Sequence, residues 1–251
     1  MRILGIESSS LVASVAIVTD QVLTAEYTVN FKKTHSQTLL PMIDEISTML
    51  ELDLNCVDAI AVSGGPGSFT GLRIGSATAK GLGLALQKPL IHIPTVDAMA
   101  YNLYGTSALI CPIMDARRNQ VYTGLYHFEK EFKVVKPQCA MDIRMLAEEL
   151  NARGERVIFL GDGVPVYESV IRDQMTVPWD LAPAQSNRQR AASVAALGVV
   201  YYEQGRTETA MEHAPDYLRK AQAERELEEA QRQGKTKELA AGHSVGEGAG
   251  V

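Results

Sequence analysis

The chain of 251 residues carries a formal net charge of −6. This acidic balance argues against direct binding to a nucleic-acid backbone, which requires clustered Lys and Arg. Three cysteines without a CxxC spacing argue against a disulfide framework and indicate a reducing compartment. The N-terminal apolar run is too short for a signal peptide. No stretch approaches the roughly 18 apolar residues of a membrane span, so we expect a cytoplasmic protein.

The first hundred residues alternate strands with helices, which predicts an α/β unit with some parallel pairing. Strands are expected at residues 2–6, 13–18, 23–29, 58–62 and 89–93. Residues 38–50 place apolar side chains at helical spacing, with Pro41 marking the first turn. A second helix follows a glycine-rich loop and runs to residue 86, and a third is expected at 95–103 with Thr95 as its N-cap.

A similar pattern begins at residue 108. Strand 108–114 is followed by Asp115 as strand 2–6 is followed by Glu7, and a polar turn and a returning strand come next in both places. This weak internal repeat suggests two related subdomains, although two unrelated hairpins would give the same pattern. The remaining elements expected are strands at 120–128 and 156–160 and helices at 142–152, 164–173 and 188–204.

Three regions follow from this pattern. Residues 1–106 are predicted to form an N-terminal subdomain and residues 107–220 a C-terminal one. After Lys220 the sequence becomes charged and then Gly-rich, which predicts a disordered tail over residues 221–251.

The stretch SGGPGSFTGLRIGSATAKGLGLAL, residues 63–86, holds seven glycines. It fits neither the Walker loop, nor the dinucleotide fingerprint, nor the nucleophile elbow. A less regular loop at a helix N-terminus could still hold an anion. The residues that would form such a nucleotide or anion loop are Gly65, Gly67, Ser68 and Thr70.

Small residues form two stripes on the helix of this stretch. Gly71, Gly75, Ala79 and Gly83 recur every four residues, and a second stripe contains Ala77, Gly81 and Ala85. An interior glycine costs about 1 kcal/mol relative to alanine, and close packing of backbones can offset that cost. One stripe can meet the chain's own sheet while the other meets a helix of a partner. We place the partner on the first stripe, so that Ala79→Leu should weaken association without unfolding. The predicted interface comprises His35, Leu39, Leu40, Arg73, Gly75, Ser76, Ala79, Lys80 and Gly83.

Residues for catalysis or metal binding are sparse. No two of the five histidines lie within four residues of each other, so no metal site is expected. Glu7 and Asp115 are the only carboxylates considered for catalysis, and turn chemistry explains both as well.

Several motifs resemble those of the bacterial TsaB (YeaZ) family. These are ILGIESSS at the N-terminus, HSQTLLPMI at 35–43, GGPGSFTGLRIG at 64–75 with KGL at 80–82, DARRNQVY at 115–122 and HAPDYLRK at 213–220. The resemblance covers residues 1 to about 220 and implies an α/β fold of two subdomains of the actin/Hsp70/sugar-kinase (ASKHA) type, with mixed sheets flanked by helices.

The resemblance also implies a role and partners. Members of the family are non-catalytic paralogues of TsaD, the metal-binding enzyme that transfers a threonylcarbamoyl group to the adenosine beside the tRNA anticodon. They pair with TsaD, and with themselves as homodimers, through helices of the N-terminal subdomain, and the ATPase TsaE joins the pair. The acidic balance of the chain favours contact with tRNA only indirectly, through TsaD. An intermediate case stays open, in which a nucleotide (ADP or ATP) is held at the TsaD junction without being hydrolysed by this chain.

Three departures favour a non-catalytic role. The TsaD metal motif H-x-E-G-H aligns with TVDAM at 95–99, which lacks both histidines. Ser8–Ser10 supply neither Lys nor Gly for a phosphate turn, and Glu7 stands where Asp is common. Two alternatives stay open: an independent nucleotide hydrolase or kinase that uses Glu7, Asp115 and residues 64–70, and a metallopeptidase, which the missing histidines disfavour.

Overall fold

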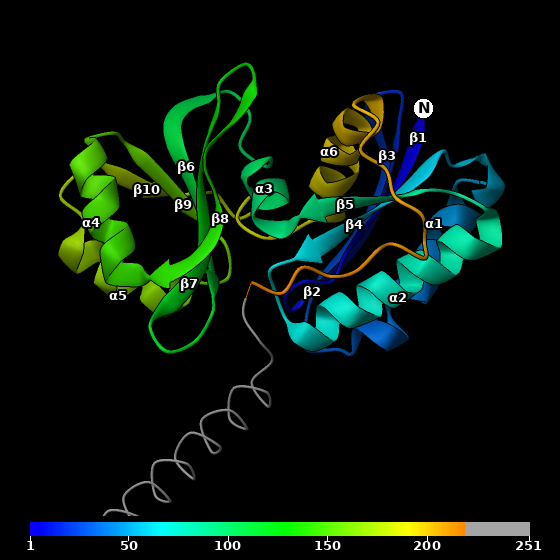
Figure 1. Cartoon of the computed structure of the whole chain (residues 1–251), viewed down its shortest axis with the longest axis horizontal. Coiled ribbons are helices and arrows are strands. Elements are labelled where there is room, and N and C mark those ends of the chain that lie inside the picture. The colour runs from blue at the N-terminus through cyan, green and yellow to red at the C-terminus, as the bar shows by residue number, and fades with distance from the viewer. Residues whose placement is uncertain (219–251) are drawn as a thin grey trace, which may run out of the picture. The chain divides into compact units, whose positions relative to one another are not determined.

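The computed structural model describes residues 1–218 (Figure 1), so the tail predicted at 221–251 lies outside the described residues. The chain forms two five-stranded mixed sheets with helices packed on their faces. Within residues 1–218, no helix is both long enough and apolar enough to cross a membrane.

The first sheet has the strand order β3-β2-β1-β4-β5, in which β1 pairs antiparallel with β2 and parallel with β4. The strands are β1 (Arg2–Glu7), β2 (Val12–Thr19), β3 (Val22–Asn30), β4 (Ala59–Gly65) and β5 (Leu90–Pro94). Strand β4 is buried along its whole length, as expected for a parallel strand covered on both faces.

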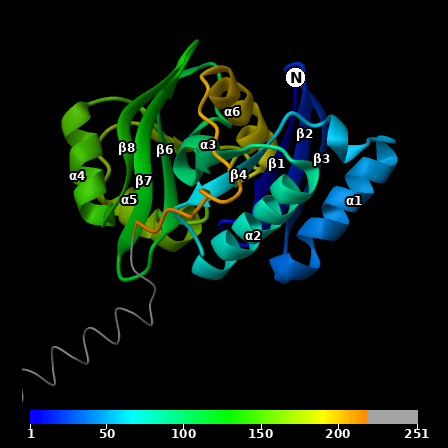
Figure 2. The same cartoon turned by 45° about the vertical axis from the view of Figure 1, so that its right-hand side comes forward.

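Helices cover both faces of this sheet (Figure 2). The elements are a 3₁₀ turn η1 (His35–Gln37), α1 (Leu39–Met49), a 3₁₀ turn η2 (Leu54–Cys56), α2 (Phe69–Leu86), α3 (Thr95–Ala100) and α6 (Ala191–Glu203). Apolar residues of α1 and α2 pack with Leu4 and Ile60, and those of α6 pack with Ile3 and Ala61. Alternate residues of each strand therefore face opposite helical layers.

The second sheet has the order β10-β9-β6-β7-β8, with β6 parallel to β9 and antiparallel to β7. Its elements are β6 (Thr106–Asp115), β7 (Gln120–Phe128), β8 (Phe132–Asp142), α4 (Ile143–Arg153), β9 (Val157–Leu160), α5 (Val164–Gln174) and β10 (Trp179–Leu181). Helices α4 and α5 pack on one face. Helix α3 packs on the other face, where Val96 and Met99 join Ile110 and Tyr126.

The structure differs from the sequence predictions in five places. Pro94, not Thr95, is the N-cap of α3, and that helix ends at Ala100 instead of residue 103. Strands β8 and β10 were not predicted, because lysines and Pro137 interrupt the alternation in β8 and β10 has three residues. Helix α6 begins at Ala191 instead of residue 188, since Arg190 has an extended backbone.

Helix α6 also changes the meaning of the predicted subdomain at 107–220. Ala191 donates its N–H to Ser14 Oγ of β2 at 2.9 Å, and the apolar residues of α6 pack on the first sheet. The predicted C-terminal interval therefore contains a helix that completes the core of the first sheet, because only there does an apolar face remain for it to cover.

Candidate functional site

The turn after β1 uses Glu7 as a structural acceptor. Glu7 is 1% exposed, and its Oε1 accepts from both the Ser9 N–H and the Ser9 hydroxyl at 2.6 Å. Burial raises the pKa of Glu7, and these hydrogen bonds lower it less strongly. The carboxyl group is thus engaged in shaping its own turn.

Helix α2 lies directly on that turn, which explains its glycines. A Cβ at Gly67 would overlap the carbonyl oxygen of Ser9, and one at Gly71 would overlap that of Ser8. Ser8 Oγ also donates to the Gly71 carbonyl at 2.9 Å. The glycines at the start of α2 therefore allow its backbone to approach the β1 turn more closely than any larger residue permits.

Two backbone donors of the predicted anion loop are engaged inside the protein. The Gly65 N–H donates to Thr95 Oγ1 at 3.2 Å, and the Ser68 N–H donates to the Ser9 carbonyl at 2.6 Å. Ser68 Oγ accepts from the Gly71 N–H at 3.3 Å, as the N-cap of α2. Gly67 is held against Ser9, and Thr70 belongs to the first turn of the helix. Anion binding by this loop stays a prediction, and these engaged donors weaken it.

Asp115 has a similar role at the end of β6. Its Oδ1 accepts from the Arg117 N–H at 2.8 Å and from the Tyr167 hydroxyl at 2.9 Å. Three consecutive residues, Arg117, Arg118 and Asn119, have positive φ values of 64°, 55° and 59°. Such conformations cost about 1–2 kcal/mol for each non-glycine residue, so the Asp115 contacts hold a strained turn in place.

A third carboxyl group, Asp162, was not singled out from the sequence. It follows β9, is hydrogen-bonded by Gln189 Nε2 at 3.1 Å, and has its pKa raised by burial. The charge of Asp162 further raises the pKa of Glu7. The charge of Asp115 in turn raises the pKa of Asp162. The signal was the sequence Gly161-Asp162-Gly163 directly after the predicted strand 156–160, because Glu7 similarly follows the predicted strand 2–6.

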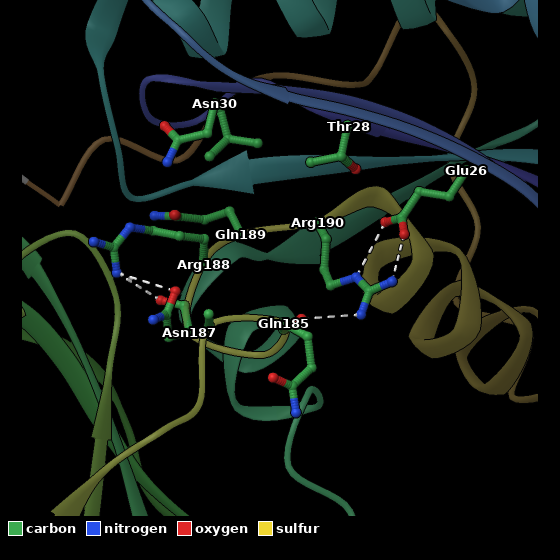
Figure 3. Close-up of a pocket in the computed structure, with 10 residues that line it drawn as sticks. Glu26, Thr28, Asn30, Gln185, Asn187, Arg188, Gln189 and Arg190 are labelled. Atoms are coloured by element: carbon green, nitrogen blue, oxygen red, sulfur yellow. Dashed lines mark hydrogen bonds and ion pairs between the residues drawn. The ribbon is translucent and has the colours of Figure 1, made fainter.

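A polar pocket of 360 Å³ lies between β3 and residues 184–190 (Figure 3). On its right side, Arg190 faces Glu26 and forms a two-pronged ion pair with it. Arg188 Nη1 donates to the Gly161 carbonyl at 3.0 Å and to the Asn187 carbonyl at 2.9 Å. Both guanidinium groups thus have protein partners. The pocket lies where the segment before α6 meets the edge strand β3 of the first sheet.

A second pocket, of 470 Å³, lies between α1 and α2, and we call it the α1–α2 groove. It is lined by His35, Ser36, Leu39, Leu40, Ile74, Ala77, Thr78, Gly81 and Leu82. Leu40 is 54% exposed on its rim. Apart from its chain neighbours and the backbone of its own helix, no described atom lies within 4 Å of the position of a Cβ at Gly81. Leu84 and Met49, on the same two helices, are also exposed. The groove therefore presents small and apolar groups to solvent.

The groove contains only part of the interface predicted from the sequence. His35, Leu39 and Leu40 line it, although Leu39 is also part of the core. Arg73 is exposed and lies over the Phe69 ring at 4.2 Å. Lys80 is half-buried and donates to the His213 carbonyl at 2.9 Å.

The remaining predicted interface residues face the interior of the chain, and their part in an interface stays a prediction. Gly75, Ser76, Ala79 and Gly83 are buried. Gly75 faces Ser8, Gly83 faces Leu90, and Ala79 belongs to the core formed with the first sheet. The second stripe, Ala77, Gly81 and Ala85, is the exposed one. The sequence indicated two stripes, but spacing alone could not show which of them faces the sheet.

Residues 95–99, the position of the TsaD-type metal motif, form part of the interior. Thr95 and Met99 are 0% and 1% exposed. Asp97 accepts from the Tyr126 hydroxyl at 2.6 Å, and burial raises its pKa. These residues offer a single carboxyl group, already hydrogen-bonded, in an apolar setting, so they do not fit a divalent metal ion.

Comparison with known proteins gives a consistent result. A family model described as TsaD, tRNA N6-adenosine threonylcarbamoyltransferase, matches residues 25–227. The chain is 33% identical to the tRNA threonylcarbamoyladenosine biosynthesis protein TsaB of Bacillus subtilis, covering 92% of this chain and 100% of that one. It is 30% identical to TsaB of Escherichia coli, covering 87% and 95%, respectively.

Solved structures agree with the sequence relatives. A crystal structure from Pseudomonas aeruginosa, described as an uncharacterized protein with similarity to peptidase YEAZ, matches with a TM-score of 0.75 at 26% identity, covering 87% of this chain and 99% of that one. The two mixed sheets flanked by helices define a protein of the ASKHA class, as predicted. Within that class, the chain belongs to the TsaB (YeaZ) family.

Proposed function

We propose that this chain is a non-catalytic scaffold and activating subunit in the formation of tRNA threonylcarbamoyladenosine, the pathway named for its TsaB relatives. In this proposal it pairs with TsaD in the cytoplasm, and TsaE joins the pair. The observation that carries the proposal is the α1–α2 groove, where apolar and small residues face solvent on two adjacent helices.

The state of the polar groups supports a non-catalytic role. Glu7 and Asp115 are hydrogen-bonded into their own turns, and residues 95–99 are packed into the interior. A catalytic acid or base must instead reach the substrate. The reaction chemistry then belongs to TsaD, and this chain contributes a surface.

The groove also suggests how the chain behaves alone. An exposed apolar groove between helices can receive an apolar helix of a partner, so in the absence of TsaD we propose a homodimer formed through the same surface. The net charge of −6 favours indirect contact with tRNA through TsaD. A nucleotide at the TsaD junction is retained as a subordinate part of the proposal.

The decisive test measures threonylcarbamoyl transfer to unmodified tRNA with TsaD, TsaE and threonylcarbamoyl-adenylate, with and without this chain. The variant Gly81→Arg should block the groove without disturbing the fold, because a side chain at Gly81 points into open space. We expect transfer to require the chain and to fall at least tenfold with Gly81→Arg.

The matched control is Ala152→Arg, which adds the same charge at an exposed position on α4 and should leave transfer unchanged. Transfer that does not depend on the chain would overturn the proposal. Steady ATP turnover by the chain alone, lost in Asp115→Asn, would instead support the independent nucleotide hydrolase.

A further inference from the structure

Three side chains that are distant in the sequence meet beside β5. His92 lies on that strand, and Glu208 is fixed to its edge by a two-residue bridge with Leu90, whose N–H and carbonyl both bond to Glu208 at 2.8 and 2.9 Å. A turn then brings His213 back, since its N–H donates to the Thr209 carbonyl at 3.1 Å. One ligand atom from each of His92, Glu208 and His213 lies within 4.8 Å of the other two.

The His213 ring is held in one orientation with one nitrogen unused. Its side chain is 0% exposed, and Nδ1 is 2.7 Å from Glu208 Oε1. A carboxylate accepts only from a protonated nitrogen, so Nδ1 carries a proton, and in the neutral form of the ring Nε2 carries a lone pair. Within residues 1–218, this buried Nε2 has no hydrogen-bond partner. Buried polar atoms without partners are uncommon and indicate a missing ligand, ion or water.

The His92 ring lies beside that of His213. The two ring centroids are 5.8 Å apart. A Cβ at Gly64 would overlap the His92 ring, so this glycine of the signature stretch leaves room for the imidazole. His213 therefore has one nitrogen paired with a carboxylate oxygen and one nitrogen left over, the arrangement found around metal-bound histidines, and the second imidazole stands next to it.

We propose that His92 and His213 bind one divalent transition-metal ion of the Zn²⁺ class, with Glu208 as the carboxylate that positions His213 and balances the charge. Imidazole nitrogens suit such ions. Zn–N bonds of about 2.1 Å in a tetrahedral site require ligand atoms roughly 3.4 Å apart, a spacing that lies within the 4.8 Å limit of this cluster. Water or a group from a partner completes the coordination.

Neighbouring charges are compatible with a bound cation. Asp216 interacts electrostatically with His92 and adds a second negative charge to that of Glu208. The Lys80 ammonium opposes them but is directed to the His213 carbonyl at 2.9 Å. The ion would fasten residues 208–213 to β5, and so would act as a structural clasp independent of the groove.

The test uses the untagged full chain with Cys56→Ser, because the exposed thiol of Cys56 could bind Zn²⁺ by itself. The probe is Zn²⁺ alone, measured by calorimetric titration and by metal analysis after dialysis. We expect one ion per chain, with affinity at least 100-fold weaker in His92→Gln and His213→Asn and about 10–100-fold weaker in Glu208→Gln. The asparagine keeps an N–H for Glu208.

The control variant is His127→Gln, which removes the imidazole of another His–carboxylate pair, His127 with Glu155 on the second sheet. It should bind Zn²⁺ as the parent does. Absence of stoichiometric binding, or equal binding by parent, His92→Gln and His213→Asn, would overturn the site. If His213→Asn does not fold by circular dichroism, His92→Gln decides, since loss of the Zn²⁺-induced rise in Tm supports the site and its persistence refutes it.

Discussion

Gly75 of α2 lies against the hydroxyl group of Ser8 in the turn after β1, with no room for a methyl group between them. Alanine is favoured over glycine inside a helix by about 1 kcal/mol, whereas overpacking costs about 1–3 kcal/mol. We therefore expect Gly75→Ala to destabilise the protein by up to about 2 kcal/mol in urea unfolding. Gly81→Ala, where the Cβ position is open, should instead stabilise it by up to about 1 kcal/mol. Equal effects at both positions would contradict this packing.

Enlarging Ala79 should reduce stability and not association. Ala79 is 0% exposed in the core beneath α2, so Ala79→Leu should cost about 1–3 kcal/mol by overpacking. Ala77→Leu, on the exposed wall of the groove, should keep its Tm within a few degrees and weaken self-association. Sedimentation velocity with thermal melts separates the two effects. A selective loss of association in Ala79→Leu would restore the interface predicted from the sequence.

Stability should respond to pH through Glu7. Burial raises the pKa of Glu7 in the folded chain above its usual value of 4.5, so the folded state holds this proton more tightly than the unfolded state. Its contribution is therefore fully present below the unfolded pKa and is lost as the pH rises through the folded pKa. Glu7→Gln keeps an oxygen for both Ser9 donors and removes the charge. We expect it to be more stable than the parent at pH 8, with the difference vanishing near pH 3.

Denaturant titrations of the parent and Glu7→Gln between pH 3 and pH 8 measure this difference in stability. The transfer assay, run on the same two proteins, shows whether Glu7 also acts in the reaction. If Glu7 has only a structural role, the complex reconstituted with Glu7→Gln should transfer threonylcarbamoyl as the parent complex does. Loss of transfer with unchanged stability would assign Glu7 a role in the reaction itself.

The junction between α6 and β3 should depend on one ion pair. Glu26 is mostly buried, accepts from Arg190 through both oxygens, and also accepts from the Ala192 N–H at 3.1 Å. Arg190→Ala leaves that carboxylate with one partner and should cost about 1–3 kcal/mol. In Arg190→Ala, the backbone amides of α6 should exchange hydrogen faster than in the parent, by a larger factor than those of α4. Arg172→Ala, which removes an exposed pair with Glu168 on α5, should change stability by less than about 1 kcal/mol.

Much of the fold was predictable because its strands and helices carry strong periodic signals. Strands β1, β4 and β5 appear as short apolar runs, and α1 shows clear helical spacing that Pro41 in its first turn does not disturb. Strand β8 was missed because it mixes exposed and half-buried residues with no regular alternation. The place of α6 could not be predicted, since an apolar helix carries no information about which of two sheets it covers.

The candidate site was predictable only in part, for a related reason. Spacing along α2 revealed two stripes of small residues, but their orientation depends on contacts with Ser8 and Leu90. The cluster of His92, Glu208 and His213 escaped because a search for nearby histidines finds only ligands on one helix or loop. The bridge between Leu90 and Glu208 is a tertiary contact that sequence spacing does not encode.

The return of α6 to the first sheet has a consequence for synthesis on the ribosome. Residues 1–106 emerge first, yet Ile3, Ala61 and Ile91 remain uncovered until Val194 and Leu197 arrive. One apolar face of the nascent N-terminal sheet therefore stays exposed while the whole second sheet is synthesised. Exposed apolar surface of this kind promotes aggregation. Chaperones that shield nascent chains should therefore prevent most aggregation of this protein after residues 1–106 have emerged and before α6 has been made.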